Sequence, residues 1–176
     1  MLDNKRIKEA ESNVRSYLAE GLLKQIKIKD NNAKSILVKN SRESLNVSKI
    51  LFTNRHSFLW TLVTAYYSMY YIAKAVLYEM NYKVEHKISH KVVSDALIAY
   101  VRKKLKESLI EDYETVKEEA LELAGVKADE LVKEFDKQRT DRERFQYSMT
   151  EMVMEQKAKT ALDRAEKFVL EMEKLL

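Results

Sequence analysis

Apolar positions recur at helical spacing along most of the chain. Before Gly21, one apolar stripe predicts a helix from about Asn4 to Leu18. Asp30 and the two asparagines after it supply N-cap side chains, and a second stripe then predicts a helix that continues to a turn at residues 54–57. The members of the two stripes are Ile7, Ala10, Val14, Tyr17 and Leu18, followed by Ala33, Ile36, Leu37, Ser44, Leu45, Leu51 and Phe52.

The third predicted helix, at about residues 58–82, is apolar on nearly every side and follows Ser57, a residue type that caps helix N-termini. A helix of this kind is covered on all sides by other elements. Residues 57–73 carry no charge, but they are rich in hydroxyl groups, which a lipid-facing helix would not choose. We therefore expect this helix in the core of a bundle or in a subunit interface, and not in a membrane. Four of its tyrosines are candidates for that core or dimer interface: Tyr66, Tyr67, Tyr70 and Tyr71.

The C-terminal half predicts four further helices, which begin near residues 89, 109, 128 and 149. The second of them is acidic, and Gly125 is well placed to follow its last turn. Ser148 and Glu151 have the pattern of a capping box for the last helix. The predicted fold class is therefore all-α: one domain, residues 1–176, built as an up-and-down bundle of four to five core helices with extra N-terminal and mid-chain helices.

Composition excludes several classes of protein. The 176 residues include two glycines, no proline and no cysteine. The turn chemistry of an all-β fold is thus missing, and so is a glycine-rich nucleotide loop of the Walker or Rossmann type. Disulfides, cysteine metal sites and a thiol nucleophile are excluded as well. The lack of cysteine fits a cytoplasmic protein, and we expect no cofactor.

The charge of the chain is unevenly distributed. The formal net charge is +4, from 32 basic and 28 acidic residues, and residues 111–136 are strongly acidic, so the remainder is basic. Such an asymmetry permits a polyanion as partner, and it is also typical of solvated helix faces. The basic clusters are Lys24, Lys27 and Lys29; Arg102, Lys103, Lys104 and Lys106; and Lys137, Arg139, Arg142 and Arg144.

His86 and His90 stand four residues apart beside Glu85, a spacing that can bind zinc when both histidines lie on one helix. Ser89 has the residue type of an N-cap, so we expect a helix boundary between the two histidines. The sequence therefore predicts no metal site.

Arg142 lies on an apolar stripe with Leu131 and Phe135, and Tyr147 stands just before the predicted last helix. A buried arginine is costly unless it is paired or faces a cleft. One interpretation gives Arg142 an internal acidic partner or a path to solvent. The other gives it a ligand in a cleft.

Three segments together resemble HEPN domains, a family named for nucleotide binding in higher eukaryotes and prokaryotes. They are the sequence AYYSMYYIAKAVLYEMNY at residues 65–82, the SHKVV at residues 89–93, and Arg142 followed after four residues by Tyr147. The likeness covers about residues 33–105 and 137–176. Residues 1–29 are therefore expected to form an N-terminal extension, and residues 109–136 an acidic helical insertion.

The resemblance implies a helical homodimer. Many family members are metal-independent endoribonucleases with an arginine, four to six residues and then a histidine. Other members bind RNA or nucleotides without cleaving RNA, and many are paired with a minimal nucleotidyltransferase in toxin–antitoxin systems. This chain departs from the active pattern, because Tyr147 stands where the histidine would be. A phenol is a poor base at neutral pH, whereas imidazole titrates there.

The favoured hypothesis is a dimeric protein that binds RNA or a nucleotide, or pairs with a nucleotidyltransferase, without standard HEPN ribonuclease chemistry. One alternative is a metal-independent endoribonuclease that uses Arg142 and Tyr147 as its catalytic pair. Another is a structural dimer with no nucleic-acid role. The candidate residues for binding RNA or nucleotide are Arg142, Arg144, Tyr147, His90 and Lys91.

Overall fold

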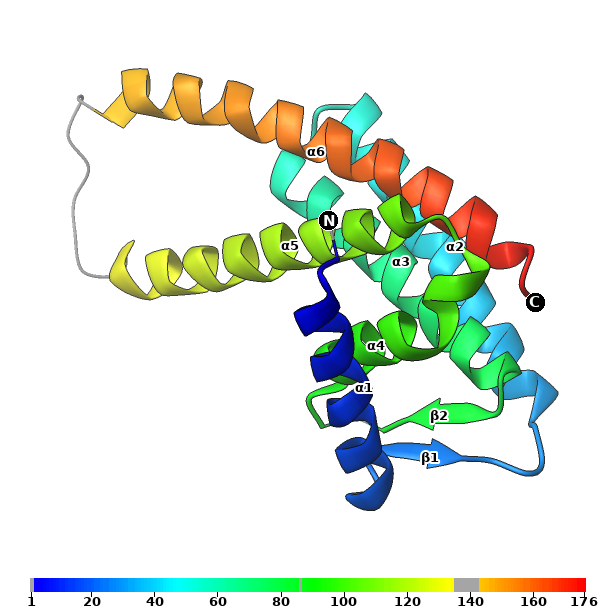
Figure 1. Cartoon of the computed structure of the whole chain (residues 1–176). Coiled ribbons are helices and arrows are strands. Elements are labelled where there is room, and N and C mark those ends of the chain that lie inside the picture. The colour runs from blue at the N-terminus through cyan, green and yellow to red at the C-terminus, as the bar shows by residue number, and fades with distance from the viewer. Residues whose placement is uncertain (1, 86, 135–142) are drawn as a thin grey trace.

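The computed structural model describes residues 2–85, 87–134 and 143–176, with the side chains of Asn31, 126–134 and 143–151 left out of the description. These residues form an all-α fold, as the sequence predicts, with one small two-stranded sheet added to it (Figure 1). The elements are α1 (Asn4–Ala19), β1 (Leu23–Gln25), α2 (Asn31–Thr53), α3 (Phe58–Glu79), β2 (Tyr82–Val84), α4 (Ser89–Ala96), a π-helical turn η1 (Leu97–Val101), a 3-10 turn η2 (Arg102–Lys104), α5 (Glu107–Glu134) and α6 (Glu143–Glu173).

Helix α3 is the central element of the bundle, which confirms the interpretation of its all-round apolar sequence. It packs against α2, α5 and α6 (Figure 1). Short connections, residues 54–57 and 80–81, join it to α2 and to β2. Each large apolar side chain buried in this way stabilises the fold by about 1.5–3 kcal/mol. The α3 side chains that are fully covered include Leu62, Tyr66, Met69, Ile72, Val76 and Leu77, and α5 adds Ile110, Tyr113 and Val116 to the same core.

The structure confirms the predicted N-cap residues of α2 and α3. The carboxylate of Asp30 accepts a hydrogen bond from the Asn32 backbone N–H at 2.8 Å, and the Ser57 hydroxyl accepts one from the Trp60 N–H at 3.2 Å. Gly21 has a φ of 72° just after α1, in the left-handed region that glycine adopts without steric cost.

Two predicted helix boundaries and one predicted N-cap residue are wrong. Helix α5 passes through Gly125 and ends at Glu134, so Gly125 is a helical residue and no separate helix starts near residue 128. Helix α6 already begins at Glu143, which places Ser148 inside the helix and not at its N-cap. The predicted start of the helix near Ser89 is confirmed, since Ser89 is the first residue of α4, but the capping position belongs to Ile88, whose φ is 43°. In each case a local capping pattern lies within or beside a helix that packing or strong helix formers extend.

The small sheet was not expected. Strands β1 and β2 pair antiparallel, with Leu23 opposite Val84, Lys24 opposite Lys83 and Gln25 opposite Tyr82. The opposed lysines are both close to Glu85, whose carboxylate lies 2.9 Å from Lys24 Nζ and 3.7 Å from Lys83 Nζ. This acidic neighbour offsets the repulsion of a like-charged cross-strand pair.

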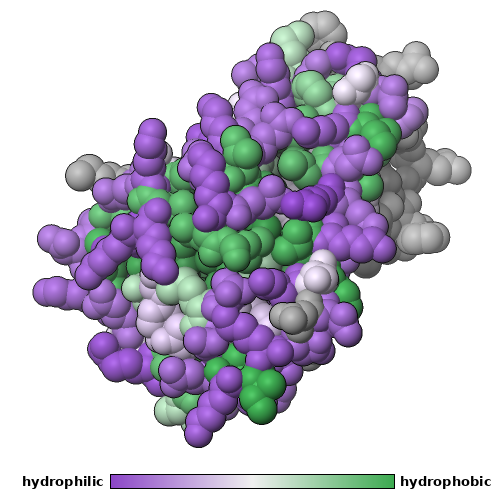
Figure 2. All heavy atoms as spheres, turned by 90° about the vertical axis from the view of Figure 1, so that its right-hand side faces the viewer, coloured by the Kyte–Doolittle hydropathy of each residue, from purple (hydrophilic) through white to green (hydrophobic). Residues whose placement is uncertain are grey.

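The surface carries charged side chains with apolar ones between them. Figure 2 shows such a mixture on the side of the molecule where α2 and the C-terminal end of α6 lie. Among the exposed apolar side chains of these two helices, Ile36 is 56% and Leu170 is 59% exposed. Within the described ranges, no helix combines the length and the apolar character that crossing a membrane would require.

Candidate functional site

The structure locates only part of the predicted site. Arg142 lies outside the described residues. Arg144 and Tyr147 fall within α6, but their side chains are not among those described. His90 is half-buried in the first turn of α4, and Lys91 beside it is exposed. The candidate site can therefore be built from the tyrosines of α3 and the start of α4.

The tyrosines of α3 form one continuous aromatic cluster. Helical spacing places Tyr66 and Tyr70 one turn apart on the covered side of the helix, where Tyr66 is fully buried and Tyr70 is 6% exposed. Tyr67 and Tyr71 lie next to them and are half-buried. Neighbouring ring centroids in this cluster are 5.6 to 6.1 Å apart, within the usual range of aromatic pairs.

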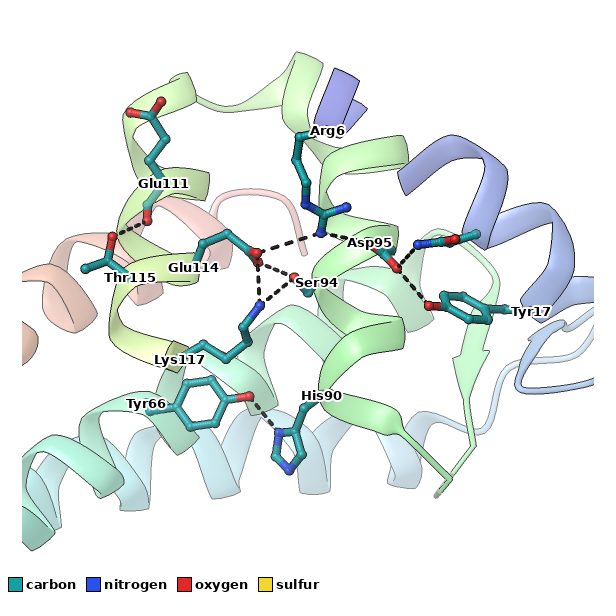
Figure 3. Close-up of polar contacts among 11 residues, drawn as sticks. Arg6, Tyr17, Tyr66, His90, Ser94, Asp95, Glu111, Glu114, Thr115 and Lys117 are labelled. Atoms are coloured by element: carbon teal, nitrogen blue, oxygen red, sulfur yellow. Dashed lines mark hydrogen bonds and ion pairs between the residues drawn. The ribbon is translucent and has the colours of Figure 1, made fainter. Parts of the chain in front are cut away.

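His90 adds its ring to this cluster from α4. Its centroid lies 4.7 Å from that of Tyr70, 5.6 Å from that of Tyr66 and 6.0 Å from that of Tyr67. The Tyr66 hydroxyl lies 2.6 Å from His90 Nδ1 (Figure 3). The sequence had singled out both residues, but it gave no sign that they touch.

This hydrogen bond determines which nitrogen of His90 carries the proton. Burial raises the pKa of the Tyr66 phenol far above its usual value, so the hydroxyl keeps its proton and needs an acceptor. The Nδ1 atom of His90 lies within hydrogen-bond distance of this hydroxyl and can accept its proton, while the other polar neighbour, the buried phenol of Tyr113, also keeps its proton because burial raises its pKa. Burial, together with the charges of Lys74 and Lys117, lowers the pKa of His90, so the ring is neutral at pH 7. The tautomer that fits has Nδ1 as acceptor and Nε2–H as donor.

Lys74 approaches the same cluster from the next turn of α3. It is half-buried, and its Nζ lies 5.4 Å from the centroid of the Tyr70 ring, a cation–π distance. Burial lowers the pKa of Lys74, against the attraction of Glu85. His90 and Lys74 thus both contact the ring of Tyr70, and they bring hydrogen-bond donors to it.

Helix α4, which carries His90, is held from one side by α1. The buried carboxylate of Asp95 lies 2.7 Å from Arg6 and accepts hydrogen bonds from the Tyr17 hydroxyl at 2.8 Å and from Asn13 Nδ2 at 3.0 Å (Figure 3). Asp95 itself is fully buried. A buried carboxylate is stable only with such partners, so these contacts fix α4 against α1.

The other side of α4 is held by α5. The Ser94 hydroxyl donates to the Glu114 carboxylate, and Lys117 Nζ lies 3.0 Å from Ser94 Oγ and 2.9 Å from Glu114 (Figure 3). Sequence reasoning missed both this group and the Asp95 group. The available signal was the pair Ser94 and Asp95 inside an otherwise apolar helical stripe, because polar residues on such a stripe need buried partners.

The arrangement offers hydrogen-bond donors and aromatic faces, and it has no geometry for a metal. In the described ranges, no group of three histidine or carboxylate side chains lies close enough together to share a metal ion. His90 Nδ1 is already occupied by Tyr66. The N–H donors of Lys74 and His90 suit an anionic ligand, and the tyrosine rings can stack on an aromatic one.

Comparison with known proteins gives one clear result. A family model described as "HEPN domain" matches residues 35–175, which is most of the chain and includes α3, α4 and the aromatic cluster. No curated protein and no solved structure shows a significant match. Since the matched segment covers well over half of the sequence, the chain belongs to the HEPN domain family.

Proposed function

We propose that this protein binds RNA or a nucleotide, acting as a homodimer or with a nucleotidyltransferase partner. Membership of the HEPN family indicates a function related to nucleotides or RNA, or a toxin–antitoxin context, in general terms. The observation that carries the proposal is the position of His90. Its ring is fixed by Tyr66 and lies beside half-buried Tyr67 and beside Tyr70, whose ring also contacts the half-buried Lys74.

These groups are the types that single-stranded nucleic acid requires. Positive charge tracks the phosphates, and tyrosine faces stack on bases with little dependence on sequence. Arg142 and Arg144 would add bidentate phosphate contacts, since a guanidinium matches the geometry of two phosphate oxygens. Tyr147 would stack or donate a hydrogen bond. The standard ribonuclease step is not part of this proposal, because a phenol with a pKa near 10 is a poor proton acceptor at pH 7.

The test is a binding titration of fluorescently labelled single-stranded RNA, and of a labelled nucleotide, across a series of salt concentrations. We expect wild-type affinity to fall with salt, and Arg142→Ala to weaken binding and to reduce the salt slope by about 0.7 for each lost phosphate contact. Asp163→Ala, at an exposed position of α6, is a control that should not weaken binding. Absence of binding at low salt, with the nucleotidyltransferase partner also present, would refute the proposal.

Sedimentation of the same protein tests the dimer. A species of about twice the chain mass supports a homodimer, whereas a monomer at all concentrations contradicts that part of the proposal.

A second candidate function is metal-independent cleavage of RNA. It is favoured by the fact that His90 is neutral and keeps one nitrogen free of Tyr66, as a proton carrier in such a reaction requires. RNA should then be cleaved in EDTA by the wild type, and neither by Arg142→Ala nor by His90→Gln. Cleavage that survives both changes would point to another site or to a contaminant.

A further inference from the structure

Lys74 differs from the other partly buried lysines that the structure describes. The side chains of Lys29 and Lys34 are both 30% exposed, and each has an ion pair with Glu79, at 2.9 and 2.8 Å. Lys117 is 14% exposed and pairs with Glu114. In the described part of the chain, no carboxylate lies within ion-pair distance of Lys74.

The nearest source of negative charge is already shared. Glu85 attracts Lys74 over a longer distance, but its carboxylate lies within ion-pair distance of Lys24 and Lys83. The Tyr70 ring beneath Lys74 offers a π-face, which attracts the charge but accepts none of its N–H groups as an oxygen would. An ammonium group that is partly removed from water without an oxygen partner favours the binding of an anion.

His90 presents a second donor beside the same ring. Its Nδ1 is bound by Tyr66, and Figure 3 shows the other ring nitrogen on the far side of the imidazole from Tyr66 and from the group of Ser94, Glu114 and Lys117. Among the described residues, this Nε2–H has no hydrogen-bond partner. The ring cannot turn freely to find one, because Tyr66 and Tyr70 hold it from two sides.

The surroundings favour an anion as well. Lys83 is close enough to add its positive field to that at Lys74. Two exposed lysines flank His90 in the chain: Lys87 precedes it, and Lys91 follows it directly. A tetrahedral oxyanion has several acceptor oxygens, so one ligand can take an N–H from Lys74 and another from His90.

We propose that Lys74 and His90 form a phosphate-binding subsite on the Tyr70 ring, which receives a phosphate group of a nucleotide or of an RNA strand. The inference deepens the proposed function and rests on it for the identity of the ligand. Tyr67 and Tyr71, the half-buried neighbours of Tyr70, are the rings available to the base or sugar of that ligand.

The experiment is an NMR titration of the full-length protein that follows the histidine ring nitrogens. The chain has three histidines, so the signal of His90 is identified by its absence in His90→Gln. Inorganic phosphate and uridine monophosphate should shift this signal, and uridine should not. Uridylate oligomers with and without a 5′-phosphate separate a terminal phosphate from a backbone phosphodiester as the group that is bound.

Lys74→Met should weaken phosphate and uridine monophosphate binding about tenfold or more, as expected for loss of a charged hydrogen-bond partner. Lys74→Arg should retain most of the binding, and it serves as the readout if Lys74→Met does not fold. Lys8→Met removes the same charge from an exposed position of α1 and should leave affinity unchanged. Circular dichroism establishes that each variant is folded.

The inference is overturned if phosphate leaves the His90 signal unchanged, or if Lys74→Met binds as tightly as Lys8→Met. If RNA binds and Lys74→Met does not alter that binding, the proposed phosphate subsite is wrong, but the proposed function stands. If inorganic phosphate binds at His90 but neither RNA nor any nucleotide binds, the proposed function fails together with the assigned ligand, and only a site for free phosphate remains.

Discussion

The buried carboxylate of Asp95 gives the sharpest test of how α4 is held. Asp95→Asn keeps the size of the side chain but removes its charge and replaces one acceptor oxygen with a donor. In the wild type, the carboxylate is in contact with three donor groups, from Arg6, Asn13 and Tyr17. After the change, at least one of them faces an N–H group and loses its partner.

The magnitude follows from these contacts. A hydrogen bond to a charged group contributes about 1.5–3 kcal/mol, and breaking a fully buried ion pair costs about 3–5 kcal/mol. The Arg6 side chain is 28% exposed, so water recovers part of its loss, and one acceptor oxygen remains on the asparagine. We therefore expect the free energy of unfolding to fall by about 3 kcal/mol. For a domain of this size, this loss lowers Tm by about 6–12 °C.

The assay is thermal and urea unfolding followed by circular dichroism, with Asp163→Asn as the matched control. Asp163 is exposed on α6, so its change should stay within about 0.5 kcal/mol of the wild type. Tyr17→Phe removes one of the three donors, and in a double-mutant cycle with Asp95→Asn it should show a coupling of about 1–2 kcal/mol. An Asp95→Asn protein as stable as the control would refute the conclusion that this group fixes α4.

Three further predictions concern other positions. Gly125→Ala should stabilise the protein by about 1 kcal/mol in urea unfolding, because Gly125 is helical and no atom lies within 4 Å of the added Cβ. Gly21→Ala should destabilise the protein by about 1 kcal/mol, because the φ of Gly21 is 72°. Equal signs for the two alanine variants would contradict the assigned backbone conformations. Tyr66→Phe keeps the ring but removes the proton donated to Nδ1, so the pKa of His90 should rise in an NMR pH titration, and an unchanged value would show that the hydrogen bond does not favour the neutral ring. The pKa of free His90 lies below its usual 6.5 and a bound anion raises it, so phosphodiester binding should strengthen as pH falls from 7 to 5 in the wild type and stay flat in His90→Gln. The titratable groups that face His90 are Tyr66, Tyr67, Tyr70 and Lys74 of α3, and Lys117 of α5.

The parts of the fold that depend on local chemistry were predictable. Asp30 and Ser57 cap their helices through contacts with residues two or three positions away, so a short stretch of sequence contains the whole signal. The central position of α3 followed from its lack of a polar face. Gly125 misled for the opposite reason. A glycine inside a helix destabilises it by about 1 kcal/mol relative to alanine. The neighbouring Glu, Leu, Ala and Lys residues favour the helix by more than this, and no proline interrupts it.

The parts that depend on distant pairing were not predictable. Strands β1 and β2 have three residues each and lie far apart in the chain, so neither shows an alternating pattern long enough to recognise. Helical spacing correctly placed Tyr66 and Tyr70 on one side of α3, but only the packing of α4 brings His90 against them. The unpaired state of Lys74 has no sequence signal either, because it depends on where Glu85 and two other lysines lie.

The geometry of the candidate site depends on a part of the chain outside the matched family segment. Helix α4 has eight residues, too few to be stable alone, so its position must come from its contacts. Its last turn is held by Arg6, Asn13 and Tyr17 of α1, all of which precede residue 35, where the family match begins. His90 lies in the first turn of this same helix and touches α3. Since one short helix carries both contacts, a displacement of α1 would move His90 relative to Tyr66 and Lys74. The N-terminal residues therefore support the proposed phosphate subsite without touching it.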